Sequence, residues 1–340
     1  SGVCSALYEL GGMTVMHDPS GCNSTYNTHD EIRWYDQDSL IYISGLTEID
    51  AIMGNDEKFL NDIMDAAREL KPRFIALAGS PIPYMNGTDF PALAEVLEQE
   101  LGIPSFSVPT NGMHDYVYGA GIALEQIARR FVSAKAVCEE KNIQPHTVNL
   151  LGVTPLDFGA YSRAGYMKKN LEKCGWKVLS TWAMGDDLEV LSHALEAEVN
   201  LVVSSVGLRT AKYLEKEFGT PYEVGYPFVD ELIPELDYAG KKILIIHQQV
   251  IANAIRQEIR TRSDEQNTEV TVASWFMMKS ELSEEGDLSL KEEMDYCKLV
   301  QNGNYDIVFV DENMRGLVPG FKGTFVNVRH FAVSGKLQES

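Results

Sequence analysis

The 340-residue sequence lacks the long apolar runs and the signature loops that identify many protein classes. No apolar run approaches the ~20 residues that a membrane-spanning helix needs. Residues 1–15 lack a basic start and include Glu9, so we expect no secretory signal. The GxxxxGKS/T phosphate loop, a strand-linked GxGxxG, the GxSxG elbow and the HExxH helix are also missing. We therefore expect no membrane span, no ATP or dinucleotide binding through those loops and no hydrolase with those signatures.

Basic residues are scarce relative to acidic ones. The chain has 29 Lys plus Arg against 50 Asp plus Glu, which gives a formal net charge of −21. Binding to a phosphate backbone requires a basic surface, and an anionic membrane repels an acidic one. The charge therefore argues against a nucleic-acid partner and against a membrane partner.

Cysteine is also rare, and its five positions are widely spaced: Cys4, Cys22, Cys138, Cys174 and Cys297. An odd number without dense spacing is typical of a reducing compartment rather than of a disulfide framework. We therefore expect a cytoplasmic protein. Cys138, Cys174 and Cys297 lie in helical patterns, where we expect structural roles.

From residue 40 onward, apolar strand-like runs alternate with amphipathic helical patterns. The predicted strands cover residues 40–43, 74–78, 105–108, 148–153, 177–181, 200–205, 242–246, 270–275 and 306–310. Between them, helical patterns cover residues 56–70, 117–141, 161–174, 208–218, 249–262 and 290–301, and another helix lies between an Asp89 cap and Gly102. Such strands, separated by helices, indicate parallel sheets that are covered on both faces.

The alternation restarts at residues 148 and 242, which indicates three Rossmann-like α/β domains with parallel sheets. We place these domains at residues 1–145, 146–238 and 239–340. Ligands of such folds bind beyond the carboxyl ends of the strands, often between domains. The loops that follow the predicted strands are therefore the places to look for a site.

The segment His17-Asp18-Pro19-Ser20-Gly21-Cys22 is one candidate site. Proline fixes φ and glycine accepts a positive φ, so this loop can hold one thiolate in a defined direction. The alternative is that Cys22 is only a small buried apolar residue.

The same segment resembles the His-Gly-Pro-x-Gly-Cys segment of the nitrogenase component 1 superfamily. That superfamily includes nitrogenase α and β chains, their cofactor scaffolds, dark-operative protochlorophyllide reductase subunits and the Ni-sirohydrochlorin reductive cyclase. Further stretches are similar to family motifs in order and spacing, at residues 46–60, 80–89, 148–152 and 211–222.

The resemblance implies three α/β domains and a dimer with an identical or a similar component 1-like chain. It also implies an iron–sulfur cluster, of the [4Fe-4S] type, where two subunits meet, with Cys22 as a ligand. A separate nitrogenase-reductase-like iron-protein ATPase would supply electrons, which fits a chain without its own phosphate loop. Such chemistry needs an anaerobic or low-oxygen environment.

The sequence departs from the family pattern at the other cluster ligands. One family cysteine falls at Pro81, or at Ser80 if the register slips by one residue, and another falls upstream of Ser1. Cys4 is the candidate replacement, and two chains that each give Cys4 and Cys22 would supply the four thiolates that a cluster normally needs. Alternatively, Cys4 is a packed helix residue. Asp18 replaces a family glycine and offers a carboxylate.

Other candidates also follow predicted strands. Ser80, Pro81, Asn86 and His114 are candidate cofactor-binding residues, although the first three also suit a simple turn. His247 can face an interdomain cleft and Arg329, beside His330, can hold an anionic group, with a surface position as the alternative for both histidines.

Three functions remain open at this point. The first is a nitrogenase-like oxidoreductase subunit that reduces an unidentified substrate. The second is a scaffold for an iron–sulfur cluster or metallocofactor precursor. The third is a small-molecule binding protein without a cluster.

Overall fold

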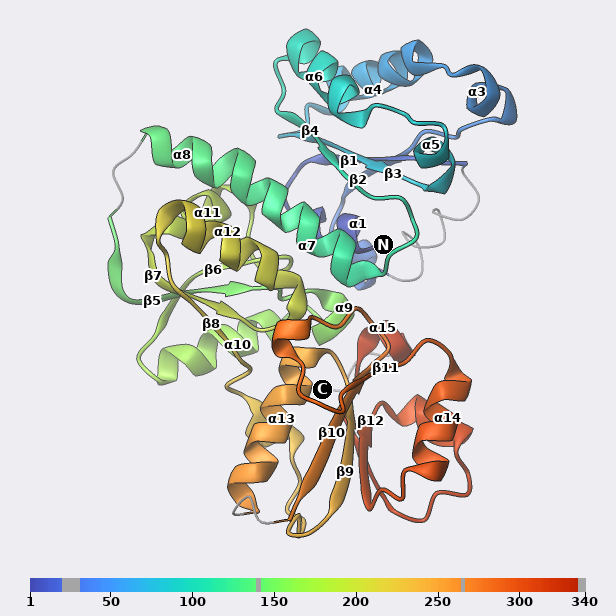
Figure 1. Ribbon diagram of the computed structural model, residues 1–340. Helices are drawn as coiled ribbons and strands as arrows, with labels where there is room; N and C mark the ends of the chain where they lie inside the picture. The colour runs from blue at the N-terminus through green and yellow to red at the C-terminus, as the bar shows by residue number, and fades with distance from the viewer. Residues whose placement is uncertain (20–30, 139–141, 264–266, 336–340) are drawn as a thin grey trace.

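The computed structural model describes residues 1–19, 31–138, 142–263 and 267–335. The described strands form three separate sheets, and every strand pairing in them is parallel. Figure 1 shows the first sheet at the top, the second at the left and the third at the bottom, with helices around each. The predicted α/β fold with parallel sheets is therefore confirmed, whereas the exact domain boundaries stay a prediction.

The first sheet has the strand order β2-β1-β3-β4. Its strands are β1 (Met13–His17), β2 (Leu40–Ile43), β3 (Ile75–Gly79) and β4 (Ser105–Val108). One face packs against α4 (Asp56–Leu70) and α6 (Phe90–Leu101), and the other packs against α1 (Gly2–Leu7) and α7 (Tyr116–Ile127). The short helices α3 (Glu48–Met53) and α5 (Pro81–Met85) lie at the right-hand end of this sheet in Figure 1.

The second sheet has the order β6-β5-β7-β8. Its strands are β5 (Gln144–Leu151), β6 (Lys177–Thr181), β7 (Ala197–Val202) and β8 (Tyr222–Val224). The helices of this unit are α9 (Pro155–Phe158), α10 (Ser162–Lys173), α11 (Leu188–Ser192) and α12 (Leu208–Phe218). From the first unit, α7 continues through a wider turn at Ala128–Val132 into α8 (Ser133–Cys138) and packs along α12.

The third sheet has the order β11-β10-β9-β12-β13. Its strands are β9 (Lys242–Ile246), β10 (Glu269–Ser274), β11 (Leu288–Ser289), β12 (Ile307–Val310) and β13 (Thr324–Asn327). The helices of this unit are α13 (Gln249–Arg262), α14 (Glu293–Asn302) and α15 (Phe331–Ser334). Among the described residues, no helix is both long and apolar enough to cross a membrane.

Local signals in the sequence set several element ends. The Asp89 side chain accepts a hydrogen bond from the backbone N–H of Ala92 at the start of α6, and Gly102 ends that helix in a left-handed conformation. Gly219 ends α12 in the same way, with φ at 71°. The predicted helices over residues 56–70, 208–218 and 249–262 match α4, α12 and α13 at both ends.

Candidate functional site

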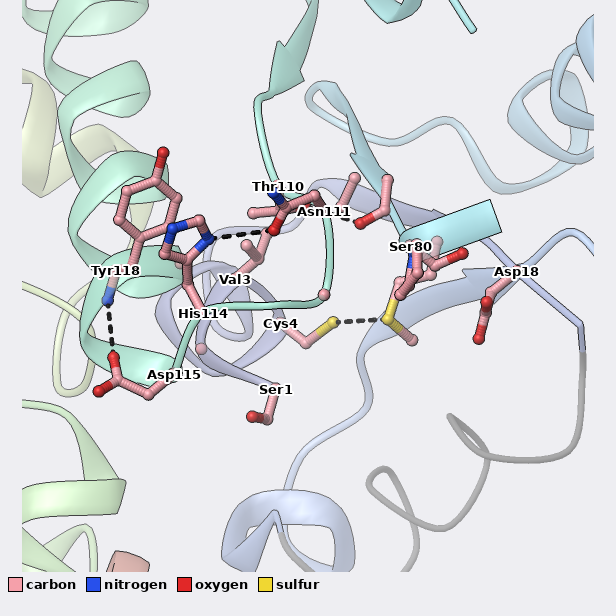
Figure 2. A pocket seen from close by; sticks show the side chains of 17 residues that line it. Ser1, Val3, Cys4, Asp18, Ser80, Thr110, Asn111, His114, Asp115 and Tyr118 are labelled. Carbon is pink, nitrogen blue, oxygen red and sulfur yellow. Dashed lines mark hydrogen bonds between the residues drawn. The ribbon is translucent and has the colours of Figure 1, made fainter. Parts of the chain in front are cut away.

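A cavity of about 240 Å³ lies at the carboxyl edge of the first sheet. It is bounded by the ends of β1, β3 and β4 and by the first turns of α1, α5 and α7 (Figure 2). The carboxyl ends of parallel strands share one edge, which is where α/β folds place their ligands. Five of the residues singled out from the sequence line this cavity: Cys4, Asp18, Ser80, Pro81 and His114.

Cys4 reaches the cavity because α1 packs unusually closely against α7. A Cβ at Gly2 would come within 2.2 Å of the backbone oxygen of Tyr116, so only glycine allows this approach. The Cys4 side chain is 1 % exposed, and its Sγ lies 3.6 Å from Met16 Sδ. Burial raises the pKa of the Cys4 thiol to about 11, so the thiol is protonated unless a metal takes the place of its proton.

Ser80 and Pro81 join β3 to α5 at the cavity wall. Gly112 closes the opposite side of this corner, since a Cβ there would lie 2.6 Å from Pro81 Cδ. The Ser80 hydroxyl oxygen is buried and has no hydrogen-bond partner among the described residues. A buried hydroxyl without a partner is costly, so this wall offers an unused donor and acceptor to a bound group.

His114 lies on the α7 side of the cavity (Figure 2). Its ring stacks on Tyr118 with a centroid separation of 4.1 Å, and its Nδ1 lies 3.0 Å from Asn111 Oδ1. Its neighbour Asp115 caps α7 by accepting a hydrogen bond from the Tyr118 N–H, and it also accepts one from the Met277 N–H of the third unit. The cavity wall is thereby tied to both α7 and the third unit.

The segment that contains His17 and Asp18 leaves β1 at the same edge. His17 Nδ1 lies 2.8 Å from Ser44 Oγ, which also accepts a hydrogen bond from the Asp18 backbone N–H. The His17 ring packs against Phe59, and burial lowers its pKa. These contacts suit a neutral histidine that positions the start of the loop, while Asp18 lines the cavity.

One predicted site residue, Asn86, lies away from the cavity. Asn86 is exposed, and its side chain donates a hydrogen bond to the backbone oxygen of Ala51 in α3, apart from the cavity wall. Cys22 lies outside the described residues. Cys138, Cys174 and Cys297 lie in α8, at the end of α10 and in α14, as the helical patterns predicted.

Whether an iron–sulfur cluster fits this cavity depends on which metal-ligating side chains line it. Within residues 1–19 and 31–138, Cys4 is the one cysteine that lines it, and no three His, Cys, Asp or Glu side chains of the described residues come together as metal ligands. A cluster normally takes four thiolates. The described part of one chain therefore does not complete such a site by itself.

Sequence reasoning missed a buried polar cluster between the three units. It contains Tyr116 of the first unit, Asp157 of the second, and His247 and His330 of the third, each under 10 % exposed. The surface alternative for the two histidines is therefore wrong. No local motif marks this cluster, because its members come from distant parts of the chain.

Comparison with known families gives one consistent result. The family description Nitrogenase component 1 type Oxidoreductase matches residues 9–230, which is more than half of the chain. One of the subunits of the light-independent protochlorophyllide reductase of Nostoc punctiforme is 24% identical over 269 residues, or 77% of this chain and 51% of the relative. The nitrogenase iron-molybdenum cofactor biosynthesis protein NifE of Klebsiella pneumoniae is 22% identical over 222 residues, or 62% of this chain and 48% of the relative. The chain thus spans about half the length of these relatives.

Solved structures agree at the level of the fold. The structure described as nitrogenase Cp1 at pH 6.5 superposes with a TM-score of 0.69 at 15% identity, over 96% of this chain and 83% of the other. The structure at pH 5 gives a TM-score of 0.70 at 16% identity, over 98% and 84%. Together with the family match, these results confirm the resemblance drawn from residues 17–22 and the downstream motifs. The chain belongs to the nitrogenase component 1 type oxidoreductase family.

Proposed function

We propose that this chain is the electron-accepting, catalytic subunit of a nitrogenase-like oxidoreductase. Two copies would share one iron–sulfur cluster, of the [4Fe-4S] type, at the carboxyl edge of the first sheet. The observation that carries this proposal is the cavity that brings Cys4, Ser80 and His114 to the edge at which β1 ends, five residues before Cys22 in the sequence.

Cys4 and Cys22 of each chain are the residues that would hold the cluster. When bound, a cluster of this type supplies one-electron transfer at a low potential. The chain's own contribution is to bury the Cys4 thiol in the cavity wall and to offer the Ser80 hydroxyl as a hydrogen-bond donor in the same cavity. Hydrogen bonds and exclusion of water are the means by which a protein sets the potential of such a centre.

A second copy is favoured by the surface next to the cavity. The exposed side chains of α3 and α5 there are largely apolar: Ile49, Ile52, Met53, Tyr84 and Met85. Ile49, Ile52 and Met53 are 73%, 81% and 77% exposed, and Asn86 ties the two helices together. A contiguous exposed apolar patch is typical of a protein interface. Because α5 begins at the cavity wall with Pro81, an interface here would close the cavity from outside.

The electron donor would be a separate reductase-like iron-protein ATPase, since this chain has no phosphate loop of its own. The substrate is a small molecule of unidentified class. We propose a cytoplasmic, low-oxygen setting, in keeping with the reduced cysteines and with an oxygen-sensitive cluster.

The alternative is a scaffold or a cluster-free binding protein. The observation that favours it is Pro81, which stands where the family motif has a cysteine and which cannot supply a thiolate. Turnover that depends on a reductase distinguishes an enzyme from a scaffold, because a scaffold binds iron and sulfide without reducing a substrate.

The test is anaerobic purification and reconstitution, followed by iron and sulfide analysis, visible spectra and light scattering. We expect about four iron atoms per dimer, loss of the iron in Cys4→Ser and Cys22→Ser, and no change in Cys174→Ser, an exposed cysteine of the second unit. A colourless, iron-free protein after reconstitution, with Cys22→Ser like wild type, would overturn both cluster functions.

A further inference from the structure

A surface groove of about 400 Å³ lies along α7 and α12, which pack side by side (Figure 1). Residues 279 and 281, at the short turn Ser280–Leu282 of the third unit, complete its wall. The groove shares no lining residue with the cavity at the first sheet, and no member of the buried polar cluster lines it. It is therefore separate from both sites described above.

This groove concentrates positive charge in a chain whose formal net charge is −21. Five basic side chains line it: Arg129, Arg209, Lys212, Lys216 and Lys279. Two carboxylates, Glu125 and Glu281, line it as well. Five against two leaves an excess of three positive charges, which repel one another unless an anion lies among them.

The two carboxylates hold several of the cations in place. Glu125 pairs with Arg129 and Arg209, each at 2.7 Å, and Glu281 pairs with Lys212. The side chains of Arg129, Arg209 and Lys212 nevertheless remain 49%, 44% and 45% exposed. The groove thus presents fixed cationic groups that solvent, or a ligand, can reach.

Lys279 is the groove cation that lacks a carboxylate partner. Its Nζ lies 3.3 Å from Met277 Sδ, and no carboxylate of the described residues forms an ion pair with it. Burial lowers the pKa of Lys279, and the charge of Arg209 lowers it further, while Asp115 and Glu281 offset only part of this shift. An anion in the groove would favour the charged form of Lys279 and relieve the repulsion.

The geometry of the cations indicates a compact, multivalent anion. A guanidinium presents a planar fork that fits two phosphate oxygens, and an ammonium adds a point charge beside it. A long polyanion would also meet the acidic remainder of the chain, which disfavours nucleic acid. A small anion touches only the groove and avoids that repulsion.

We propose that this groove binds a small phosphate-bearing anion, a phosphate ester or a diphosphate, whose oxygens contact Arg209, Lys212 and Lys279. Such an anion would bridge α12 and the third unit. The site needs neither the cluster nor the reductase, so its test is independent of the proposed function.

The first test labels lysines with pyridoxal 5′-phosphate, which joins a phosphate to an aldehyde. The aldehyde forms an imine with a lysine amine, with loss of water, and borohydride reduces the imine to a stable amine that mass spectrometry locates. We expect Lys279 to react faster than Lys242, a 42% exposed lysine elsewhere in the third unit. Inorganic pyrophosphate, at about ten times its dissociation constant, should slow labelling of Lys279 about 10-fold and leave Lys242 unchanged.

The second test measures pyrophosphate binding by calorimetry in two matched variants. Lys212 is 45% exposed and pairs with Glu281, and Lys242 is 42% exposed and pairs with Glu269. We expect Lys212→Gln to bind pyrophosphate about 10-fold more weakly, since a hydrogen bond to a charged group is of that order. Lys242→Gln should bind it as tightly as wild type.

Four results would each overturn the proposal. They are equal labelling of Lys279 and Lys242, labelling that pyrophosphate does not slow, protection by a hexaglutamate peptide but not by pyrophosphate, and equal binding by the two variants. The labelling of wild type decides the matter even if Lys212→Gln does not fold.

Discussion

The cavity on the first sheet and the buried cluster between the three units are built in opposite ways. The cavity is open and held mainly by backbone packing, with one thiol and one hydroxyl left without strong partners. The interunit cluster is held by side chains: Tyr116 and His330 both contact Asp157 Oδ1, and only Asp157 Oδ2 lacks a hydrogen-bond partner among the described members of the cluster. The first arrangement suits a site that another chain completes, and the second suits a site that this chain completes alone.

The two regions are connected at the start of α7. His114 and Asp115 line the cavity, and the next residue, Tyr116, belongs to the interunit cluster. Asp115 also accepts a hydrogen bond from the third unit. A change in one region can therefore affect the other through the first turn of α7. The informative variants are those that alter one region and leave the other unchanged.

The largest effect should come from Arg33, which fixes α1 and hence Cys4. Its guanidinium is 2% exposed, pairs with Glu31 and Glu9, and donates hydrogen bonds to the backbone oxygens of Ser5 and Ala183. Arg33→Leu would leave two buried carboxylates without their cation. We expect a loss of about 3–5 kcal/mol in the free energy of unfolding, measured by urea denaturation.

The matched control for Arg33 is an exposed ion pair. Arg68 and Asp65 lie on the outer face of α4 and are 59% and 79% exposed. Arg68→Leu should change the stability by less than about 1 kcal/mol. If both variants lose the same stability, the position of Cys4 does not depend on the buried pair.

A smaller effect is expected from Tyr116→Phe, which acts on the interunit cluster. The variant removes the hydroxyl that donates to Asp157 Oδ1 and leaves the aromatic packing against Phe276 in place. We expect a loss of about 1–3 kcal/mol in the unfolding free energy, because a buried acceptor loses its partner. Iron binding at the cavity should be unchanged, and a parallel loss of iron would mean that the two regions act as one site.

Local sequence patterns were sufficient to predict the fold and some of the residues that line the cavity. Strand and helix patterns predicted the parallel α/β units, and candidates placed after strand ends came together because those ends share one edge. Asn86 departed from this expectation because its side chain bonds to α3 instead. The cluster of Tyr116, Asp157 and His330 had no local signal, since three units must pack before it exists.

The pH dependence of stability should reveal the contribution of His247, one of the two buried histidines of the interunit cluster. The folded-state pKa of His247 lies well below the usual 6.5, because burial and His330 disfavour its charged form. The unfolded chain therefore binds more protons as the pH falls below about 6.5, and the stability decreases in that range. We expect the free energy of unfolding to fall between about pH 6.5 and 5 in wild type and to fall less in His247→Gln. If the unfolding free energy of His247→Gln falls with pH as steeply as that of wild type, other groups cause the loss of stability. His17 would be the next residue to test, since burial lowers its pKa as well.

The smallest effect is expected from Asn86→Ala, which tests whether the cavity ends at Pro81. Asn86 donates one exposed hydrogen bond to Ala51 at 2.7 Å, so its loss should cost about 0.5–1.5 kcal/mol or less. Anaerobically reconstituted protein should keep its full iron content, whereas Cys4→Ser should not. If Asn86→Ala lost iron while its melting temperature stayed the same, the site would extend along α5 to its end. In that case the apolar surface of α3 and α5 would belong to the cofactor site itself and not only to the contact with a second chain.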